Sequence, residues 1–401
     1  MPAVFALFAH GKQTWNVSKL ALCTSLVVLV FAPGASGQPQ TQLPGVLLSK
    51  GFVGLYRLAP SGAIQRLVGT DIRPLAVAAD GTAAGVRASD RGQNGPLFIA
   101  RGTTRTELPH SSDGVHCVAF SGDGSLAAYI SGKAVLTEPS PGLVYFQIDG
   151  TLWLADVAHP EQARAIDSRT FAVSECPLPS PTGQRFAYLI RTTPGVWELR
   201  LYRNGGVATV ADEQTPIPSN HDRSFAWAPN GTLAFIRVDE LWVGHRRIAT
   251  GLVGKLAPNP KARHGEALDF SSDGRLIAVC FGDRTAIFRL NGGLVRVVHG
   301  HLIDWSGSEG VLTIGDTRQA VVAFYRYPLR GAVRLLAYHF KLPAVSDPAG
   351  AWFAYPLAQT GRFVFRRASG SLLRVVRLHS VAAPLAAVAR SGRLSVPAGS
   401  Y

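Results

Sequence analysis

Histidine side chains are concentrated in the polar stretches that separate the apolar segments of this chain. Eight of the eleven histidines lie in such stretches. Imidazoles gathered with carboxylate or guanidinium groups could bind a metal ion, an anionic ligand or the tail of a partner, and their charge would change near about pH 6 to 7. No pair has the spacing of a metal-binding motif, and polar residues also favour loops for solvation alone. The candidate binding set consists of His116, His221, Arg223, His264, Glu266, His299, His301 and His339.

Carboxylates give little support for catalysis. The sequence contains no GxSxG nucleophile turn, no HExxH, no phosphate-binding glycine loop and no dinucleotide fingerprint. Asp269 and Asp304 lie within expected strands, and either could serve as a general acid or base if it were buried beside a substrate. We predict instead that both accept hydrogen bonds from neighbouring strand ends. The prediction is therefore a chain that is not an enzyme and has no cofactor, with a metal-dependent hydrolase or lyase as the alternative.

Basic side chains are concentrated toward the C-terminus. The formal net charge is +14, and from Arg318 onward twelve basic residues face one acidic residue, Asp347, so that segment alone carries +11. Such a sector would attract acidic glycans, anionic lipid headgroups or nucleic acid. The alternative is that its arginines only keep exposed strands soluble. The residues that we name as the basic sector are Arg362, Arg366, Arg367, Arg374 and Arg377.

A repeated strand-turn-strand unit must position all these residues. Its clearest copies are VAFSGDGSLAAYI, LDFSSDGRLIAV, FAWAPNGTLAFI and PLPSPTGQRFAYLI, and weaker copies place their turns at Gly81, Gly310, Gly350 and Gly392. Asp-Gly and Asn-Gly suit a tight hairpin because glycine adopts positive φ without strain and the Asx side chain caps the turn. Successive turn glycines are 36 to 59 residues apart, which is the spacing of four-stranded propeller blades.

The repeats predict an all-β propeller of four-stranded antiparallel blades, because a lone sheet of this size cannot bury both faces. Eight blades are favoured, and seven is the alternative because the long gap before Gly183 contains a candidate insertion, residues 133–142. Strands from both termini should close the ring. Either AAVARSGRLSV supplies the first two strands of the closing blade, or it supplies only the first and GVLL (45–48) the second. The histidine-bearing connections would then converge at the mouth of the central channel.

The repeat resembles that of the TolB-type, WD-repeat-like propeller family, in which an aromatic residue and serine precede Asp-Gly and an apolar strand. The resemblance covers nearly all of the chain after residue 38. The sequence shows no leading α/β domain of the kind that TolB itself carries. The copies at Gly81 and Gly350 also lack the aromatic residue and the serine that usually precede the turn. The resemblance implies protein or peptide partners in the cell envelope.

The N-terminal residues predict export. Lys12 and Lys19 precede the 12-residue apolar run LALCTSLVVLVF, and the small residues Ala35 and Gly37 suit cleavage. We predict a signal peptide at 1–37, a short linker at 38–44 and a single propeller domain at 45–397, with a retained N-terminal anchor as the alternative. The run is well short of the roughly 20 residues that span a bilayer, and we expect no membrane span in the mature chain. Export also argues against a nucleic-acid partner.

The sequence leaves open whether Cys117 and Cys176 form a disulfide. Cys117 and Cys176 each precede their turn glycine by seven residues, so we expect them at equivalent places on the inner strands of consecutive blades. A disulfide is possible in an oxidising compartment, but we expect inner strands to be too far apart for it. We predict both as small buried apolar side chains.

These observations favour an exported, periplasmic or secreted, non-catalytic propeller that binds a protein or peptide at the channel mouth. The alternatives are the propeller enzyme at the same mouth and a binder of an anionic envelope polymer through the basic sector.

Overall fold

The structure is a computed structural model of the chain. It divides into two compact units, Met1–Gln40 and Thr41–Tyr401, and the second contains all the described strands. The predicted signal peptide lies outside the described residues. The structure describes residues 44–395 except 90–94, 113, 141–142, 173–175, 182–183, 194–195, 215–223, 238, 257–265, 282–283, 308–309, 316–320, 327–331, 337–343, 358–360, 381 and 389–393.

Antiparallel strands account for nearly all of the regular structure. Five sheets have four strands in chain order. They consist of β4 (Ile72–Val77), β5 (Ala83–Arg87), β6 (Phe98–Arg101) and β7 (Thr104–Glu107); β16 (Phe225–Trp227), β17 (Leu233–Arg237), β18 (Glu240–Val243) and β19 (Arg246–Thr250); β20 (Glu266–Phe270), β21 (Leu276–Phe281), β22 (Arg284–Arg289) and β23 (Leu294–His299); β24 (His301–Ser306), β25 (Gly310–Gly315), β26 (Val321–Arg326) and β27 (Ala332–Leu336); and β28 (Val345–Ser346), β29 (Trp352–Leu357), β30 (Arg362–Arg367) and β31 (Leu372–Arg377). Two short helices, η1 (Pro160–Gln162) and α1 (Leu252–Leu256), lie in connections.

One larger sheet contains two successive four-strand groups. Its strands are β8 (Val115–Phe120), β9 (Leu126–Ser140), β10 (Leu143–Asp156), β11 (Arg164–Ala172), β12 (Leu178–Pro179), β13 (Phe186–Thr193), β14 (Val196–Arg203) and β15 (Gly206–Gln214). Residues 133–140 of the candidate insertion extend β9, whose ladder with β10 continues to the pair Leu143↔Ser140. The two groups are joined where Thr170 and Phe171 pair with β13. Counting them separately gives eight groups among the described strands, but one ladder runs through both, so the blade number stays a prediction.

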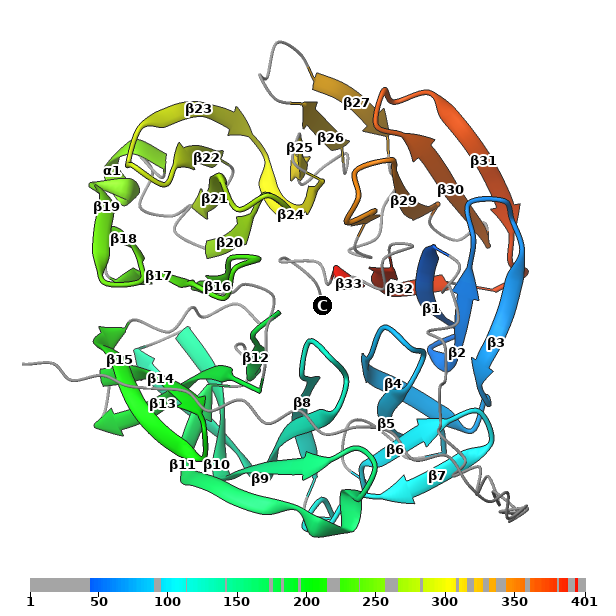
Figure 1. Cartoon of the computed structure of the whole chain (residues 1–401), viewed down its shortest axis with the longest axis vertical. Helices are drawn as coiled ribbons and strands as arrows, with labels where there is room; N and C mark the ends of the chain where they lie inside the picture. The colour runs from blue at the N-terminus through cyan, green and yellow to red at the C-terminus, as the bar shows by residue number, and fades with distance from the viewer. Residues whose placement is uncertain are drawn as a thin grey trace, which may run out of the picture. The chain divides into compact units, whose positions relative to one another are not determined.

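The first strands of the groups form the inner ring of the propeller (Figure 1). Contacts run from β4 to β8, β8 to β12, β16 to β20, β20 to β24, β24 to β28, β28 to β32 and β32 back to β4. Between β12 and β16, the Trp227 Nε1–H donates to the Leu178 carbonyl over 3.0 Å. Apolar side chains fill the space between neighbouring groups, as where Ile277 and Phe288 pack with Ile236. The shared interior between groups is what the repeat pattern predicted.

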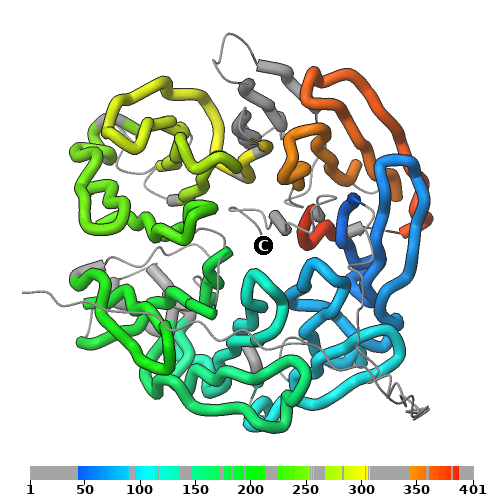
Figure 2. The backbone as a smooth tube through the Cα atoms, viewed as in Figure 1, coloured from blue at the N-terminus to red at the C-terminus, as the bar shows by residue number. Residues whose placement is uncertain are grey.

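Both termini build the closing sheet, as expected (Figure 2). Its order is β3 (Ile64–Val68), β2 (Val53–Leu58), β1 (Gly45–Lys50), β32 (Ala382–Val388) and β33 (Leu394–Ser395). Neither of the two expected arrangements is complete: GVLL lies between β2 and β32, as in the second, but the C-terminal residues supply two strands, β32 and β33, as in the first. The side chains of β1 are buried on both faces of the sheet, because Val46 and Leu48 pack in one hydrophobic cluster and Leu47 packs in another.

Two of the repeat turns show how the same geometry is reached with different side chains. At Gly124 (φ 73°), the Ser121 carbonyl accepts the Gly124 N–H over 2.8 Å, while Asp123 Oδ1 accepts the Ser125 N–H over 3.0 Å. At Gly350 (φ 80°), the aspartate instead stands three residues before the glycine: Asp347 accepts the N–H groups of Ala349 and Ala351, each over 3.1 Å. The looser turn is therefore still capped by a carboxylate. Gly310 is the first residue of β25 rather than a turn residue, whereas Gly183 and Gly392 lie outside the described residues.

The cysteine prediction is wrong: Cys117 and Cys176 form a disulfide. Cys117 lies in β8, and Cys176 lies two residues before β12. Because β12 has only two residues, Cys176 lies outside its ladder, and the Cα atoms are 5.2 Å apart, inside the range of disulfides. The bond thus links the inner strands of two successive groups.

Candidate functional site

The predicted channel-mouth set is only partly visible. His221, Arg223, His264 and His339 lie outside the described residues, and only the backbones of His116 in β8 and Glu266 in β20 are described. Of the eight members, His299 and His301 are the two whose side chains the structure describes. His299 ends β23 and is exposed, and His301 begins β24 and is half-buried. The structure therefore brings no described part of the set together beyond these sequence neighbours, and the mouth stays a prediction.

His301 contacts the interior of the protein through one ring nitrogen. Its Nδ1 lies 3.2 Å from the Sγ of Cys280, a cysteine that is not in a disulfide. A thiol beside an imidazole is the pairing that activates cysteine nucleophiles. Cys280 is fully buried, however, so a substrate could not reach its sulfur. The contact fixes the orientation of the imidazole at the start of β24.

The two inner-strand carboxylates join neighbouring strand groups, which confirms the prediction for them. Asp304 in β24 is buried, and its Oδ2 accepts the Ser346 N–H over 2.9 Å and the Ser346 hydroxyl over 2.6 Å from β28. Asp269 in β20 accepts the Trp305 N–H from β24 over 2.8 Å. Both carboxylates thus hold one inner strand to the next. Among the described residues, no group of three His, Cys, Asp or Glu side chains could hold a metal ion.

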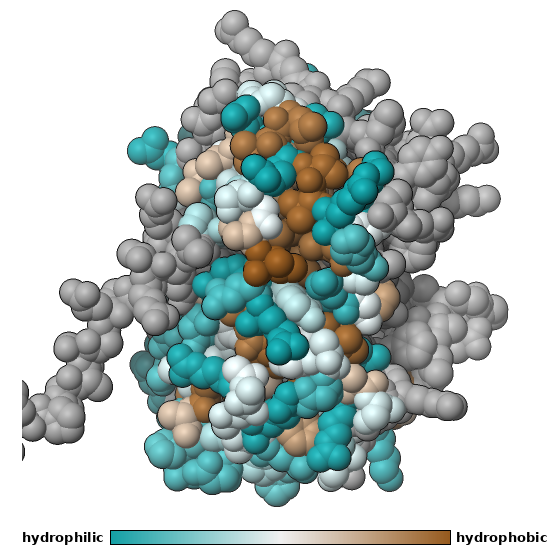
Figure 3. Space-filling view, turned by 90° about the vertical axis from the view of Figure 1, so that its right-hand side faces the viewer, coloured by the Kyte–Doolittle hydropathy of each residue, from teal (hydrophilic) through white to brown (hydrophobic). Residues whose placement is uncertain are grey.

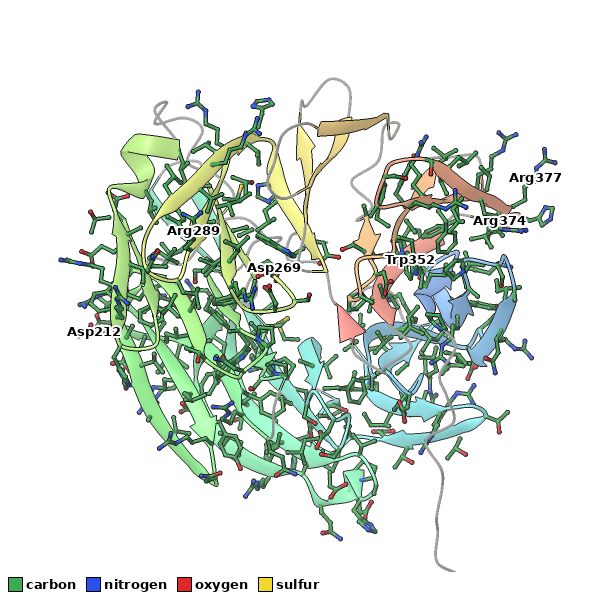
Figure 4. The ribbon with its side chains drawn as sticks, turned by 45° about the horizontal axis from the view of Figure 1, so that its top comes forward. Asp212, Asp269, Arg289, Trp352, Arg374 and Arg377 are labelled. Atoms are coloured by element: carbon green, nitrogen blue, oxygen red, sulfur yellow. A yellow bond between two sulfur atoms is a disulfide. The ribbon has the colours of Figure 1, made fainter. Side chains whose placement is uncertain are left out.

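The basic sector lies on the outer strands of one group. Arg362 in β30 and Arg377 in β31 stand opposite each other in register, and both are exposed. Arg374 and Arg377 lie at the outer rim, whereas Asp269 lies toward the centre (Figure 4). The stem of Arg374 passes over Gly62, in the turn between β2 and β3. Arg366 differs from the others, because it donates to the Tyr355 hydroxyl over 3.1 Å and to the Gly370 carbonyl over 2.7 Å, and so supports its own hairpin.

The other four arginines of the sector lack a charged partner within the described part of the chain. We call them the β31 arginine cluster: Arg362, Arg367, Arg374 and Arg377. No carboxylate of the described residues forms an ion pair with any of them. Like charges placed directly opposite on two strands repel each other, as Arg362 and Arg377 do. The cluster is therefore a surface whose charge no described carboxylate neutralises, and it could accept anionic groups.

Apolar side chains are exposed beside this cluster. Figure 3 faces the side of the ring that holds β3 and β31 in Figure 1, and an apolar patch lies in its upper half between hydrophilic residues. On these two strands the large exposed apolar side chains are Ile64 (45%), Leu372 (54%) and Val375 (45%). Exposed apolar groups rimmed by charge are typical of interaction surfaces.

A second hollow, which the sequence did not predict, lies between two strand groups. It is open, has a volume of about 150 Å³, and is lined by β15, β17, β18 and the residues that follow β18. Arg237 and Asp212 form an ion pair of 2.8 Å across it, and Trp242 stacks on Phe235 with ring centroids 6.2 Å apart. Its two charged side chains, Arg237 and Asp212, pair with each other, so it is a weaker site than the β31 arginine cluster. No sequence signal could have found it, because its walls come from separate strand groups.

None of the helices among the described residues is long and apolar enough to cross a membrane.

Comparison with known proteins places the fold. No protein-family model and no curated protein matches the sequence. Among solved structures, the chain is similar to BamB from Moraxella catarrhalis, with 12% identity and a TM-score of 0.50 over 82% of this chain and 97% of that one. It is also similar to the dihydro-heme d1 dehydrogenase NirN in complex with DHE, with 13% identity and a TM-score of 0.52 over 84% of this chain and 74% of that one. TolB from Acinetobacter baumannii is 15% identical over 60% of this chain and 59% of that one, with a TM-score of only 0.33. At such identities the likeness shows the fold alone, and together with the ring of strand groups it identifies this fold as the β-propeller that the repeats predicted.

Proposed function

We propose that the chain is an exported, non-catalytic scaffold that binds a protein or peptide partner. The fold supports this proposal because a propeller offers broad surfaces built on rigid strands. Asp269 and Asp304 support the non-catalytic part, since their carboxylates are engaged in hydrogen bonds between inner strands.

The observation that carries the proposal is the β31 arginine cluster. Four guanidinium groups without a described carboxylate partner stand beside exposed Leu372 and Val375. Arginine is favoured in binding surfaces because its fork of N–H groups matches a carboxylate and its stem covers apolar area. A polypeptide with acidic and apolar side chains would satisfy both features at once. The channel mouth is a second candidate surface for the same kind of partner.

A photo-crosslinking experiment in the native cells tests this proposal. Benzoylphenylalanine at position 377 should give a discrete protein adduct upon irradiation. The same probe at position 203, an exposed arginine site at the end of β14, is the matched control and should give none. A heterogeneous ladder that glycosidases remove would instead indicate an anionic polymer. No adduct at 377 would contradict the proposal for this surface.

Export has its own test. N-terminal sequencing of the protein recovered from its native cells should begin at Gln38, after removal of residues 1–37. A protein that retains Met1 and stays in the cytoplasm would contradict export, and it would leave the binding surface unaffected.

A further inference from the structure

Two outer strands of the propeller carry nearly the same sequence. β23 reads LVRVVH (Leu294–His299) and β31 reads LLRVVR (Leu372–Arg377). They belong to groups separated by the group of β24–β27. Each is the last strand of its sheet, so among the described strands one edge of each has no hydrogen-bonded neighbour. An edge of this kind presents N–H and C=O groups to which another strand can pair.

The two strands also have the same register. Arg284 pairs with His299 and Ile287 with Arg296 in one group, and Arg362 pairs with Arg377 and Phe365 with Arg374 in the other. In both pairs of strands the register shifts at the same place, where one residue of the outer strand is skipped. As a result, Leu294 pairs with Phe288 in one group and Leu372 pairs with Arg366 in the other. The likeness is therefore structural as well as sequential.

The register shift determines which side chains share a face. Leu372 stands opposite Arg366 and Val375 opposite Val364. Residues two apart on a strand point to the same face, so Leu372 and Val375 lie on one face of the sheet despite being three residues apart. Arg374, opposite Phe365, lies on the other face. The same argument places Leu294 and Val297 together and Arg296 on the opposite face.

These positions are exposed in both strands. Leu294 and Val297 have 51% and 38% of their surface exposed, close to the values for Leu372 and Val375. Arg296, Arg374, His299 and Arg377 are exposed too. Each open edge thus offers a leucine and a valine on one face, followed on that face by His299 or Arg377, and the guanidinium group of Arg296 or Arg374 on the other face. An exposed edge with apolar side chains is an aggregation hazard that proteins normally cover or interrupt.

We infer that the edges of β23 and β31 each bind an extended segment of a protein partner, in which apolar and acidic residues alternate, as an added β-strand. This inference rests on the proposed function and names its partner chemistry. In an added strand, side chains alternate between the two faces. The apolar set contacts the leucine and valine, and the acidic set reaches Arg296 or Arg374. Backbone hydrogen bonds supply affinity in such complexes, and the alternating side chains supply specificity.

A flexible polyanion would use only half of this surface. It would pair with the guanidinium groups, but it would leave the exposed apolar side chains and the edge N–H and C=O groups without new partners. The alternation across the two faces is thus the feature that selects a polypeptide strand over a polymer.

Fluorescence anisotropy with defined peptides tests the inference on the full mature chain. The probe is a labelled acetyl-(Val-Glu)5-amide, and the comparison peptide is decaglutamate. Two further probes carry N-methyl groups on the valines or on the glutamates, since only one of these sets can face the edge. We expect the unmodified peptide to bind, one methylated peptide to lose about tenfold or more in affinity, and decaglutamate to bind about tenfold more weakly.

Variants assign the binding to the two edges. The double variants Arg296→Glu/Arg374→Glu and Leu294→Ser/Leu372→Ser should each weaken binding of the Val-Glu peptide about tenfold. The matched control is Arg203→Glu/Arg246→Glu, which changes the charge equally at exposed sites on β14 and β19 and should leave binding unchanged. Circular dichroism melting checks that every variant is folded.

The inference is overturned if both methylated peptides bind like the parent, if decaglutamate binds equally well, or if the leucine variant binds normally. Failure of all peptides, together with a discrete crosslinked protein at position 377, would reject the edge-binding mode but retain the scaffold. Failure of both experiments would reject the two proposals together.

Discussion

Arginines on the strands β5–β19 and arginines on β22–β31 differ in their partners. In the first region Arg200 contacts Asp167 over 2.8 Å, Arg237 contacts Asp212 over 2.8 Å and Arg247 contacts Glu240 over 2.7 Å. In the second, Arg296, Arg374 and their neighbours have no ion pair with any described carboxylate. Several arginines of the first region are therefore paired with carboxylates of the fold, whereas the described arginines of the second are not and leave their charge available to a partner.

A covalent bond adds to this difference, because the disulfide Cys117–Cys176 lies in the first region. The Cys117→Ser/Cys176→Ser variant should lose about 2–4 kcal/mol of unfolding free energy, because the bond closes a long loop in the unfolded chain. Urea denaturation of the variant and of the parent measures the change. Cys280→Ser, which removes no disulfide, is the control and should lose less; equal losses would contradict a stabilising disulfide.

In the second region the buried carboxylate of Asp304 holds the inner strand β24 to the inner strand β28. Asp304→Ala should destabilise the protein by about 2–3 kcal/mol, because the Ser346 N–H and hydroxyl lose their acceptor in a buried place. Asp304→Asn keeps an acceptor oxygen and should lose less. If both variants lose equal stability in urea denaturation, the hydrogen bonds to Ser346 are not the cause.

Features with local causes were predictable from the sequence. The turns at Gly124 and Gly274 are as predicted, because Asp-Gly determines a hairpin within a few residues. The structural role of Asp304 followed from its position inside an apolar strand. The closing arrangement was predicted only in part, since GVLL and the second C-terminal strand were treated as alternatives, whereas the closing sheet contains both.

Features that depend on spatial proximity were not predictable. The distance between Cys117 and Cys176 depends on how short β12 is. Leu372 and Val375 lie on the same face because of a register shift, and no residue type in the two strands predicts that shift. The sequence located the basic sector correctly in the chain, but it could not separate Arg366, which supports its hairpin, from the arginines that have no described charged partner.

Charge reversal should have opposite signs in the two regions. Arg237→Glu places a like charge beside Asp212 and should destabilise the protein by roughly 0.5 kcal/mol. Arg377→Glu places a carboxylate opposite Arg362 and should stabilise it by a similar amount, roughly 0.5 kcal/mol. Urea denaturation at low salt measures both, and at about 1 M salt both effects should shrink because the charges are screened. Equal signs would contradict the claim that Arg237 is paired with a carboxylate whereas Arg377 faces a like charge.

The smallest effects concern pH, and they separate the capped turns of the two regions. In the first region, burial alone would raise the pKa of Asp123, but hydrogen bonds from Ser121 and Ser125 outweigh it and lower the pKa. In the second region, burial raises the pKa of Asp347, and the N–H groups of Ala349 and Ala351 offset it only in part. A group bound more tightly as the anion stabilises the fold above its ordinary pKa, and one bound more tightly as the acid stabilises it below.

Asp123 therefore contributes stability at neutral pH that is lost as the pH falls below its ordinary pKa of about 3.8. Asp347 contributes stability that is present below about 3.8 and is lost as the pH rises through its higher folded-state pKa. Asp347→Asn removes this loss, so from about pH 4 upward the variant should gain stability relative to the parent, whereas Asp123→Asn should lose stability at neutral pH. Urea midpoints measured from pH 3 to pH 8 give both curves. If the two variants shift stability in the same direction at neutral pH, burial does not dominate at Asp347, and the two turns are electrostatically equivalent.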